Sequence, residues 1–447
     1  MPEAADESAP GARMYDWITE LYPICRSLTG EGVRETLRSI ERRVAPVELH
    51  WTEVPTGTAV LDWEIPDEWN LREAYIEDAD GARVIDTAES NLHVMSYSEP
   101  VDTTLDLPDL DARLYSLPER PDAIPYRTSY YTRRWGFCLS DTQRRSLAPG
   151  RYRAVVDATL EPGSLTYAEV VLPGSTDQEI LLVAHVCHPS LCNDNLAGVA
   201  VAVELVRRLA QRTQRTHTFR FLFAPVTLGS ITWLSREQHE GGAVGRTAHG
   251  LVLTGLGDAS CFTYKRSRSG AAPVDRAAEH VLSHLDGTHR IIDFSPYGYD
   301  ERQLCSPGYD LPVGRLCRAT HGEHPEYHTS DDNLSFINPR SLEQSLGVLT
   351  TIIDVLEGNA TYVNTAPHGE PQLGRRGLFR NLGGVVPPST EMALLWLLNQ
   401  SDGTNSLLDI AGRAELPFAV MRSAADALVA TGLLREADDG RAGAATT

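Results

Sequence analysis

The chain has 447 residues, 42% of them hydrophobic, and a formal net charge of −21. This length can hold two or three domains with their own cores. The negative charge argues against a surface that follows nucleic-acid phosphates, and no apolar run approaches the roughly 18 residues of a membrane span. We therefore expect neither nucleic acid nor a membrane as a partner. The seven cysteines, an odd number in a long chain, indicate reduced thiols and a cytoplasmic protein.

The N-terminal segment, residues 1–45, is expected to add helices to the main domain. Residues 1–12 are acidic and poor in apolar side chains, which predicts a disordered lead. The spacing of apolar residues predicts helices over Tyr15–Tyr22 and from Arg26 to Ile40. No strand precedes the Gly-Glu-Gly turn inside the second stretch, so a helix start is favoured over a nucleotide-binding loop.

Residues 46–150 have a different character. Short alternating apolar runs are separated by Pro, Gly and Asp clusters, which predicts an inserted, β-rich domain. Its end is dense in aromatic residues, among them Tyr130, Tyr131 and Trp135. These side chains form either a packing seam between domains or one wall of a substrate pocket.

Strands and helices alternate over residues 151–363, which predicts a doubly wound, mostly parallel sheet. Ile180–Val186 is an apolar run typical of a strand buried on both faces, and Leu196–Ala210 continues with helical spacing. The strand end and the loop after it carry His185, His188 and Asp194. Open α/β sheets bind their ligands at the carboxyl ends of strands.

Histidine and aspartate side chains are natural ligands of zinc. A histidine at a strand end can also be a hydrogen-bonded structural residue, and both interpretations remain open for His185 and His188. The cysteines and histidines are not paired as in a closed structural zinc site, so an open, catalytic type of site fits the pattern better. A second polar loop, which contains His328, precedes a helix expected over Arg340–Glu357. Catalytic metals commonly gather ligands from separate segments in this way.

The C-terminal part begins with residues 364–384, whose Gly, Pro and Arg predict a linker. Residues 385–447 contain three helical stretches: Glu391–Asn399, Leu407–Ala414 and Pro417–Thr431. This pattern is typical of a winged helix, a DNA-binding shape. The acidic chain and the absence of a basic recognition face favour a role in protein contacts or packing over a regulatory role on DNA.

Five motifs in the chain resemble those of the zinc aminopeptidase superfamily, and in particular its bacterial aminopeptidase-like branch with an N-terminal β-domain insert and a C-terminal winged helix. The resemblance covers nearly the whole chain and rests on residues 26–37, 185–190, 193–198, 300–308 and 327–331. It implies that His185, Asp194 and His328 hold one or two zinc ions, with Asp194 bridging two metals or holding one. It also implies a small amino-acid-like or peptide substrate, and we expect a homo-oligomer.

The chain departs from the superfamily pattern at several positions. Cys187 stands where the superfamily has an Asp that orients the first histidine, so His188 is a candidate either for that support or for binding the metal itself. Val226 stands where the superfamily has the Glu that serves as general base. A valine cannot accept a proton, and a general base is typically worth about 10²–10⁴-fold in rate. The superfamily's strand-end Asp falls near Gly255, which leaves Asp258 as the candidate for a fourth ligand.

Two neighbouring carboxylates are candidates for the missing acid–base function. In the superfamily the comparable loop often reads Ser-Asp-His, and Asp300 matches its Asp while Glu301 takes the His position. Alternatively, both carboxylates pair with Arg302 or other arginines and only hold the loop.

Three functions remain open from the sequence. The first is a zinc-dependent hydrolase that acts on an amino-acid-like amide or ester. The second is an altered enzyme that carries out acyl transfer or cyclisation in specialised biosynthesis, where loss of the water-activating base disfavours hydrolysis. The third is a non-catalytic binding or scaffold protein that keeps the aminopeptidase fold.

Overall fold

The computed structural model describes residues 9–320, 322–378 and 389–437. Two compact units make up this part of the chain. The first contains the described residues up to Ala272 together with His289–Gly347, and the second contains Pro273–Thr288 and the described residues from Val348 onward. Of the predicted disordered lead, residues 1–8 lie outside the described residues, whereas the first helix already begins at Pro10.

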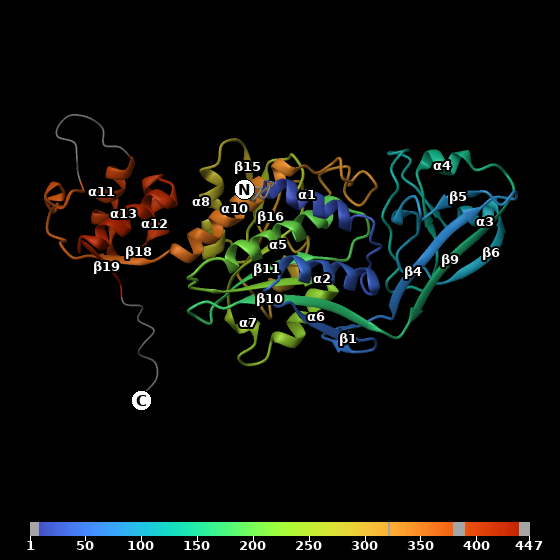
Figure 1. Ribbon diagram of the computed structural model, residues 1–447, viewed down its shortest axis with the longest axis horizontal. Helices are drawn as coiled ribbons and strands as arrows, with labels where there is room; N and C mark the ends of the chain where they lie inside the picture. The colour runs from blue at the N-terminus through green and yellow to red at the C-terminus, as the bar shows by residue number, and fades with distance from the viewer. Residues whose placement is uncertain (1–8, 321, 379–388, 438–447) are drawn as a thin grey trace, which may run out of the picture. The chain divides into compact units, whose positions relative to one another are not determined.

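The first unit is organised around an eight-stranded mixed sheet (Figure 1). Four central strands, β12, β11, β13 and β16, run parallel to one another, and β1, β10 and the β14–β15 pair complete the two edges with antiparallel neighbours. In sheet order the strands are β1 (His50–Pro55), β10 (Ser164–Leu172), β12 (Thr218–Ala224), β11 (Glu179–His185), β13 (Thr247–Leu253), β16 (Val313–Cys317), β14 (Phe262–Lys265) and β15 (His289–Ile292). All seven residues of β11 are buried, as expected for a strand covered on both faces. The predicted α/β class with its large sheet is confirmed.

Helices cover this sheet. Their bounds are α1 (Pro10–Leu21), α2 (Glu31–Val44), α5 (Ala197–Ala210), α6 (Leu228–Glu237), α7 (Ala243–Arg246), α9 (Glu301–Leu304) and α10 (Pro339–Gly358), of which α10 continues into the second unit. Helix α5 packs against β11 and also contacts α1 and α2. Gly30 adopts φ 97° directly before α2, and a Cβ there would lie 2.2 Å from the Trp69 carbonyl oxygen. The glycine turn therefore leads into a helix, as predicted.

A second, smaller sheet belongs to the inserted segment. Its four antiparallel strands lie in the order β5-β4-β9-β6. The strands of this sheet are β4 (Glu68–Glu77), β5 (Arg83–Asp86), β6 (Val101–Asp106) and β9 (Arg151–Glu161). Two short strand pairs lie outside it: β2 (Ala59–Val60) pairs with β3 (Trp63–Glu64), and β7 (Leu114–Tyr115) pairs with β8 (Phe137–Cys138). The helices of the insert are η1 (Asn91–His93), α3 (Leu107–Asp111) and α4 (Asp141–Ser146). Both ends differ from the expected boundaries of 46 and 150. Strand β1 follows residue 46 but pairs with β10 of the large sheet. Strand β9 follows residue 150 but pairs with β4 of the insert.

The second unit contains the winged helix, which confirms that prediction. Its elements are α8 (Pro273–Ser283), β17 (Thr361–Asn364), η3 (Leu373–Arg376), α11 (Ser389–Gln400), β18 (Asp402–Ser406), α12 (Leu407–Ala414), α13 (Phe418–Ala430) and β19 (Leu434–Glu436). The strands form a three-stranded sheet in the order β18-β17-β19. Helix α13 carries one arginine, Arg422, which pairs with Asp426 at 3.1 Å. Across the described ranges, no helix has both the length and the apolar character that a membrane span requires.

Candidate metal centre

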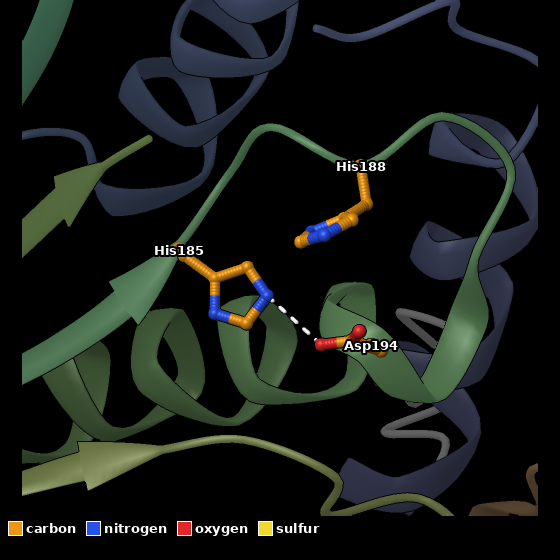
Figure 2. Close-up of side chains that lie close together, drawn as sticks. All are labelled: His185, His188 and Asp194. Atoms are coloured by element: carbon orange, nitrogen blue, oxygen red, sulfur yellow. Dashed lines mark hydrogen bonds and ion pairs between the residues drawn. The ribbon is translucent and has the colours of Figure 1, made fainter. Parts of the chain in front are cut away.

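The centre lies where β11 ends and α5 begins. His185 is the last residue of β11, His188 follows in the loop, and Asp194 lies in the short helical turn η2 (Cys192–Leu196) before α5. Figure 2 shows the three side chains pointing into one space, with His185 Nε2 3.0 Å from Asp194 Oδ1. One ligand atom of each residue lies within 4.8 Å of the other two, and all three residues are buried. The predicted group on this loop is thus brought together.

His328 joins the same group from a distant loop. Its Nε2 lies 3.0 Å from Asp194 Oδ2, so the carboxylate presents one oxygen to His185 and the other to His328. The residue adopts φ 56°, a backbone conformation that non-glycine residues rarely take and that concentrates at functional sites. Its carbonyl oxygen accepts a hydrogen bond of 2.8 Å from the Tyr126 amide of the insert, which helps to hold the loop.

The donor atoms fit a zinc ion. Within the described part of the chain, His185 Nδ1, Asp194 Oδ2 and His328 Nε2 are buried and make no well-formed hydrogen bond. Ligand atoms of tetrahedral zinc, each at about 2.0–2.1 Å from the ion, lie about 3.3 Å apart. The two 3.0 Å contacts of Asp194 are close to that spacing. Three imidazoles and one carboxylate are also the ligand types that zinc prefers.

The protonation states also suit a metal. Burial lowers the pKa of His188 to about 3, which keeps its imidazole neutral. Burial tends to raise the pKa of Asp194, but His188, His185 and His328 together outweigh this effect and hold its pKa well below the ordinary value. Neutral histidine and ionised aspartate are the forms that bind metals.

Asp332 holds the loop that carries Asp194. Its carboxylate oxygens accept hydrogen bonds from the amides of Asn193 at 2.6 Å and Asp194 at 2.9 Å, and its carbonyl oxygen accepts one from Cys192 at 3.0 Å. The residue is fully buried, and burial raises its pKa to about 8. Sequence reasoning missed this residue. Its position as a carboxylate in the same polar loop as His328 was the available signal.

Asp258, the predicted fourth ligand, has a different role. One of its oxygens accepts hydrogen bonds from Asn193 Nδ2 at 2.9 Å and the Ala319 amide at 3.1 Å, and the other accepts one from the Ser260 amide at 2.7 Å. The structure does not bring Asp258 into the histidine–aspartate group. Its carboxylate is used to fix Asn193, the residue before Asp194, so it supports the loop and is not a ligand in this arrangement.

Arg26 supports the loop from the N-terminal segment. Its Nε donates to the His188 carbonyl oxygen at 2.9 Å, and its Nη1 donates to the Leu21 carbonyl oxygen at 2.8 Å. Only 1% of the residue is exposed, and burial lowers its pKa to about 10. The first motif of the resemblance thus contributes directly to the position of His188.

The neighbouring strand, β12, ends in a loop without a carboxylate. The Val226 amide donates to Cys187 Sγ at 3.2 Å, and the valine side chain packs against the apolar core. Thr227 adopts φ 67°, and its amide donates to Asp300 Oδ1 at 2.8 Å. Cys187 therefore bonds to the β12 loop, and His185 Nδ1 lacks the orienting partner that an aspartate at position 187 would supply.

Asp300 and Glu301 differ in their surroundings although they are neighbours in sequence. Glu301 Oε1 accepts hydrogen bonds from Lys265, the chain's only lysine, at 3.0 Å and from Arg315 at 3.3 Å, and all three side chains are buried. Glu301 is therefore part of an ion cluster, although its partners are not Arg302. Asp300 is 1% exposed and accepts the hydrogen bond of the Thr227 amide; burial raises its pKa, while His185 acts in the opposite direction.

Tyrosines surround the histidines. The Tyr299 ring stacks on His185 with centroids 5.5 Å apart, the Tyr327 ring stacks on His328 at 3.9 Å, and the Tyr126 ring meets His188 and His328 edge-on. Of the aromatic residues singled out from the sequence, Tyr130 shares a 2.9 Å hydroxyl contact with Tyr126.

The other two aromatic residues lie elsewhere. Trp135 packs on Phe137, and Tyr131 is 61% exposed. The insert therefore contacts the centre through Tyr126.

Comparisons with known proteins agree with this architecture. Residues 15–359 match the family described as "Domain of unknown function (DUF4910)", and residues 360–436 match "winged helix-turn-helix". A protein of Clostridium acetobutylicum named "Putative polysaccharide biosynthesis protein with aminopeptidase-like domain" is 46% identical over 431 residues, which is 96% of this chain and 98% of that protein. A crystal structure named "putative peptidase" from the same species superposes with a TM-score of 0.90 at 44% identity, and covers 96% of each chain.

A zinc aminopeptidase of Bacillus subtilis shares the fold at greater distance, with a TM-score of 0.56, 13% identity, and coverage of 77% of this chain and 94% of that one. The chain thus shares its fold with a zinc aminopeptidase, in agreement with the predicted resemblance, and the match to the winged helix-turn-helix family confirms the C-terminal winged helix. The chain therefore belongs to the DUF4910 family of aminopeptidase-like proteins, with a winged helix that follows the aminopeptidase-like part.

Proposed function

We propose that this protein is a zinc-dependent enzyme that acts on an amide or acyl bond of an amino-acid-like substrate, and that it transfers or cyclises the acyl group in preference to hydrolysing it. The observation that carries the proposal is the convergence of His185, His188 and His328 on Asp194. The name of the 46% identical relative, which refers to polysaccharide biosynthesis, supports a substrate attached to a saccharide.

The residues of the group would hold the metal in this way. His185 and His328 face separate oxygens of Asp194, and His188 lies beside both imidazoles, with ring centroids 4.9 Å from His185 and 5.2 Å from His328. Asp332, Asp258 and Arg26 fix the loop that carries the ligands. Bound zinc supplies a Lewis acid that polarises a carbonyl group.

The chain's own residues disfavour hydrolysis. Val226 cannot accept the proton of an attacking water. The rings of Tyr126, Tyr299 and Tyr327 pack against the histidines, although the His328 side chain stays 33% exposed. Asp300 is a buried carboxylate outside the ligand group whose pKa His185 influences, and we assign it the role of accepting a proton from a nucleophile other than water.

A non-catalytic binding protein is the second candidate. The observation that favours it is the same valine together with the complete burial of the His185 side chain, which limits access to the group. Bound metal without turnover of any acylated amino compound would favour this second function.

Metal analysis of the purified protein tests the proposal. We expect zinc at one or two equivalents in the wild type and its loss in His328→Ala. His324→Ala is the matched control, because this histidine lies in the same loop and stacks on Phe336. Its other ring contact is edge-on to Tyr327 and not to a residue of the ligand group. Unchanged zinc content in His328→Ala would remove the proposed centre.

A further inference from the structure

Two exposed aromatic side chains lie together on the insert. Trp63, from β3, is 37% exposed and Tyr131 is 61% exposed, and their ring centroids are 5.4 Å apart at an interplanar angle of 52°. Among the described residues only five large apolar side chains are this exposed, and Leu61 of the same hairpin is a third. Large apolar side chains that gather on a surface mark interaction sites more often than isolated ones do.

A cleft of about 170 Å³ lies beside this pair. Tyr97, Tyr130 and Tyr131 line it with aromatic surface, and Ser129, Asp67 and Arg133 line it with polar groups. Tyr97 and Tyr130 meet edge-to-face with centroids 5.0 Å apart, so the aromatic wall is rigid. The cleft thus combines flat apolar surface with hydrogen-bonding groups.

The charges of the cleft cancel. The Arg133 guanidinium hydrogen-bonds to Asp67 Oδ2, so the cleft offers both donors and an acceptor without a net charge. The Asp67 carboxylate would repel an anionic ligand, and the Arg133 guanidinium would repel a cationic one. A neutral ligand whose hydroxyl groups both donate and accept hydrogen bonds suits this pair best.

The cleft is connected to the metal centre by two rings. Tyr130 lines the cleft, and its hydroxyl lies 2.9 Å from that of Tyr126. The Tyr126 ring in turn lies 5.2 Å from His188 and 5.1 Å from His328, measured between centroids. The Tyr130 and Tyr126 rings thus lie in series between the cleft and the histidine group, so an extended ligand would have to pass around them to reach both.

We propose that this cleft, together with the Trp63 ring that adjoins Tyr131 outside it, binds a neutral sugar unit of a glycan or glycoconjugate. The apolar face of the sugar would lie against Trp63 and Tyr131, and its hydroxyls would bond to Asp67 and Arg133. The inference rests on the proposed function in one respect, because the metal centre would act on an amide or acyl substituent carried by that sugar or by its neighbour. The binding itself does not require the metal.

The test is binding of the purified full-length chain to an array of immobilised neutral and acidic bacterial glycans. We expect wild type to bind neutral glycans, the Trp63→Ala/Tyr131→Ala variant to bind them at least tenfold more weakly, and Tyr131→Phe to stay within about threefold of wild type because it keeps the ring. Val429→Ala, an exposed apolar position in the second unit, is the control for loss of surface apolarity. Thermal unfolding of each variant checks the fold, which exposed substitutions should leave nearly unchanged.

Two results with the wild-type chain would overturn the inference: it binds no glycan, or it binds acidic glycans only. Equal binding by the Trp63→Ala/Tyr131→Ala variant, or complete loss in Tyr131→Phe, would overturn it as well. The His328→Ala variant separates this proposal from the proposed function. It should lose zinc and keep glycan binding, whereas a wild type that binds zinc but no glycan would remove the sugar site alone.

Discussion

The loops after β11 and β12 start side by side, because His185 and Ala224 are paired residues of neighbouring parallel strands. The β11 loop carries His185, His188 and Asp194. Residues from elsewhere in the chain hydrogen-bond to this loop: Asp332, Asp258 and Arg26. The β12 loop carries Val226 and Thr227 and offers no carboxylate. One loop carries the groups that we propose to hold a metal, whereas the other offers no carboxylate that could accept a proton. The difference teaches that, in this fold, ligand-type side chains on one strand-end loop do not require a carboxylate on the next.

The cost of burial explains why this difference is informative. Buried polar groups destabilise a fold unless they find partners, and the β11 loop finds them in Asp332, Asp258 and Arg26. A valine at position 226 needs no such partners, since it packs against apolar neighbours. Among the described residues, three buried donor atoms of the group, His185 Nδ1, Asp194 Oδ2 and His328 Nε2, have no well-formed hydrogen bond. This supports the proposed metal, which would satisfy them.

The largest effect is expected from Val226→Glu, which restores a proton acceptor to the β12 loop. A positioned general base is worth about 10²–10⁴-fold in rate. We expect hydrolysis of aminoacyl amides to rise by a factor in that range over wild type, measured with chromogenic substrates and matched zinc content. Val226→Gln is the control, because it has nearly the same shape and cannot take the proton. Equal activity of the Glu and Gln variants would mean that a carboxylate at position 226 does not act together with a metal held by the β11 loop.

The sequence predicted the parts of this comparison that are local in the chain. The apolar run of β11, the helix start at α5 and the order of His185, His188 and Asp194 are properties of one continuous stretch. The partners of that stretch are not local. Asp332 and Asp258 are both buried carboxylates, and only the fold shows that each accepts amide hydrogens from the Asn193 segment.

The expected boundaries of the insert differ from the observed ones for a related reason. Strands β1 and β9 have ordinary alternating patterns, which do not say which sheet supplies the neighbouring strand. Glu301 illustrates the same limit at the site. The sequence left it open between a catalytic group and an ion pair, and its contacts with Lys265 and Arg315 come from two other strands, β14 and β16.

The second largest effect is expected at the ion cluster next to the β12 loop. Glu301→Leu leaves Lys265 and Arg315 buried without their carboxylate, and removal of one partner from a buried ion pair costs about 3–5 kcal/mol. Urea unfolding should show a loss of this size in the free energy of unfolding. Asp300→Asn is the matched variant: it should lower turnover of the true substrate with a much smaller change in stability. If Glu301→Leu unfolds like wild type, the cluster does not hold this loop.

A smaller effect is expected from Asp332→Asn in the support of the β11 loop. The amide group cannot accept both backbone hydrogen bonds, so one amide of the Asn193–Asp194 pair loses its partner, at about 1–3 kcal/mol of stability. Groups that orient metal ligands typically change metal affinity by about 10–100-fold. We expect weaker zinc binding in that range in a competition titration with a chelator. Asp331, at the adjacent position, pairs with Arg120 instead. The Asp331→Asn variant is therefore the control, and it should bind zinc as wild type does.

The smallest effect is expected outside both loops, at the Arg34–Glu68 pair between α2 and β4, and it sets the baseline for the others. Hydrogen bonds from Arg34 lower the pKa of Glu68 from 4.5 to about 2. Because the folded-state pKa is depressed, the pair's contribution is present above about pH 4.5 and is lost as the pH falls towards 2. Partly exposed pairs contribute about 0–1 kcal/mol. In urea unfolding with a chelator present, Glu68→Gln should therefore be less stable than wild type by up to that amount at pH 7, and the difference should shrink on acidification. A difference that grew towards low pH would have the wrong sign for this pair. It would mean that other carboxylates cause the acid sensitivity of the fold. The comparison of the two strand-end loops would then have to include the carboxylates near them that titrate at low pH.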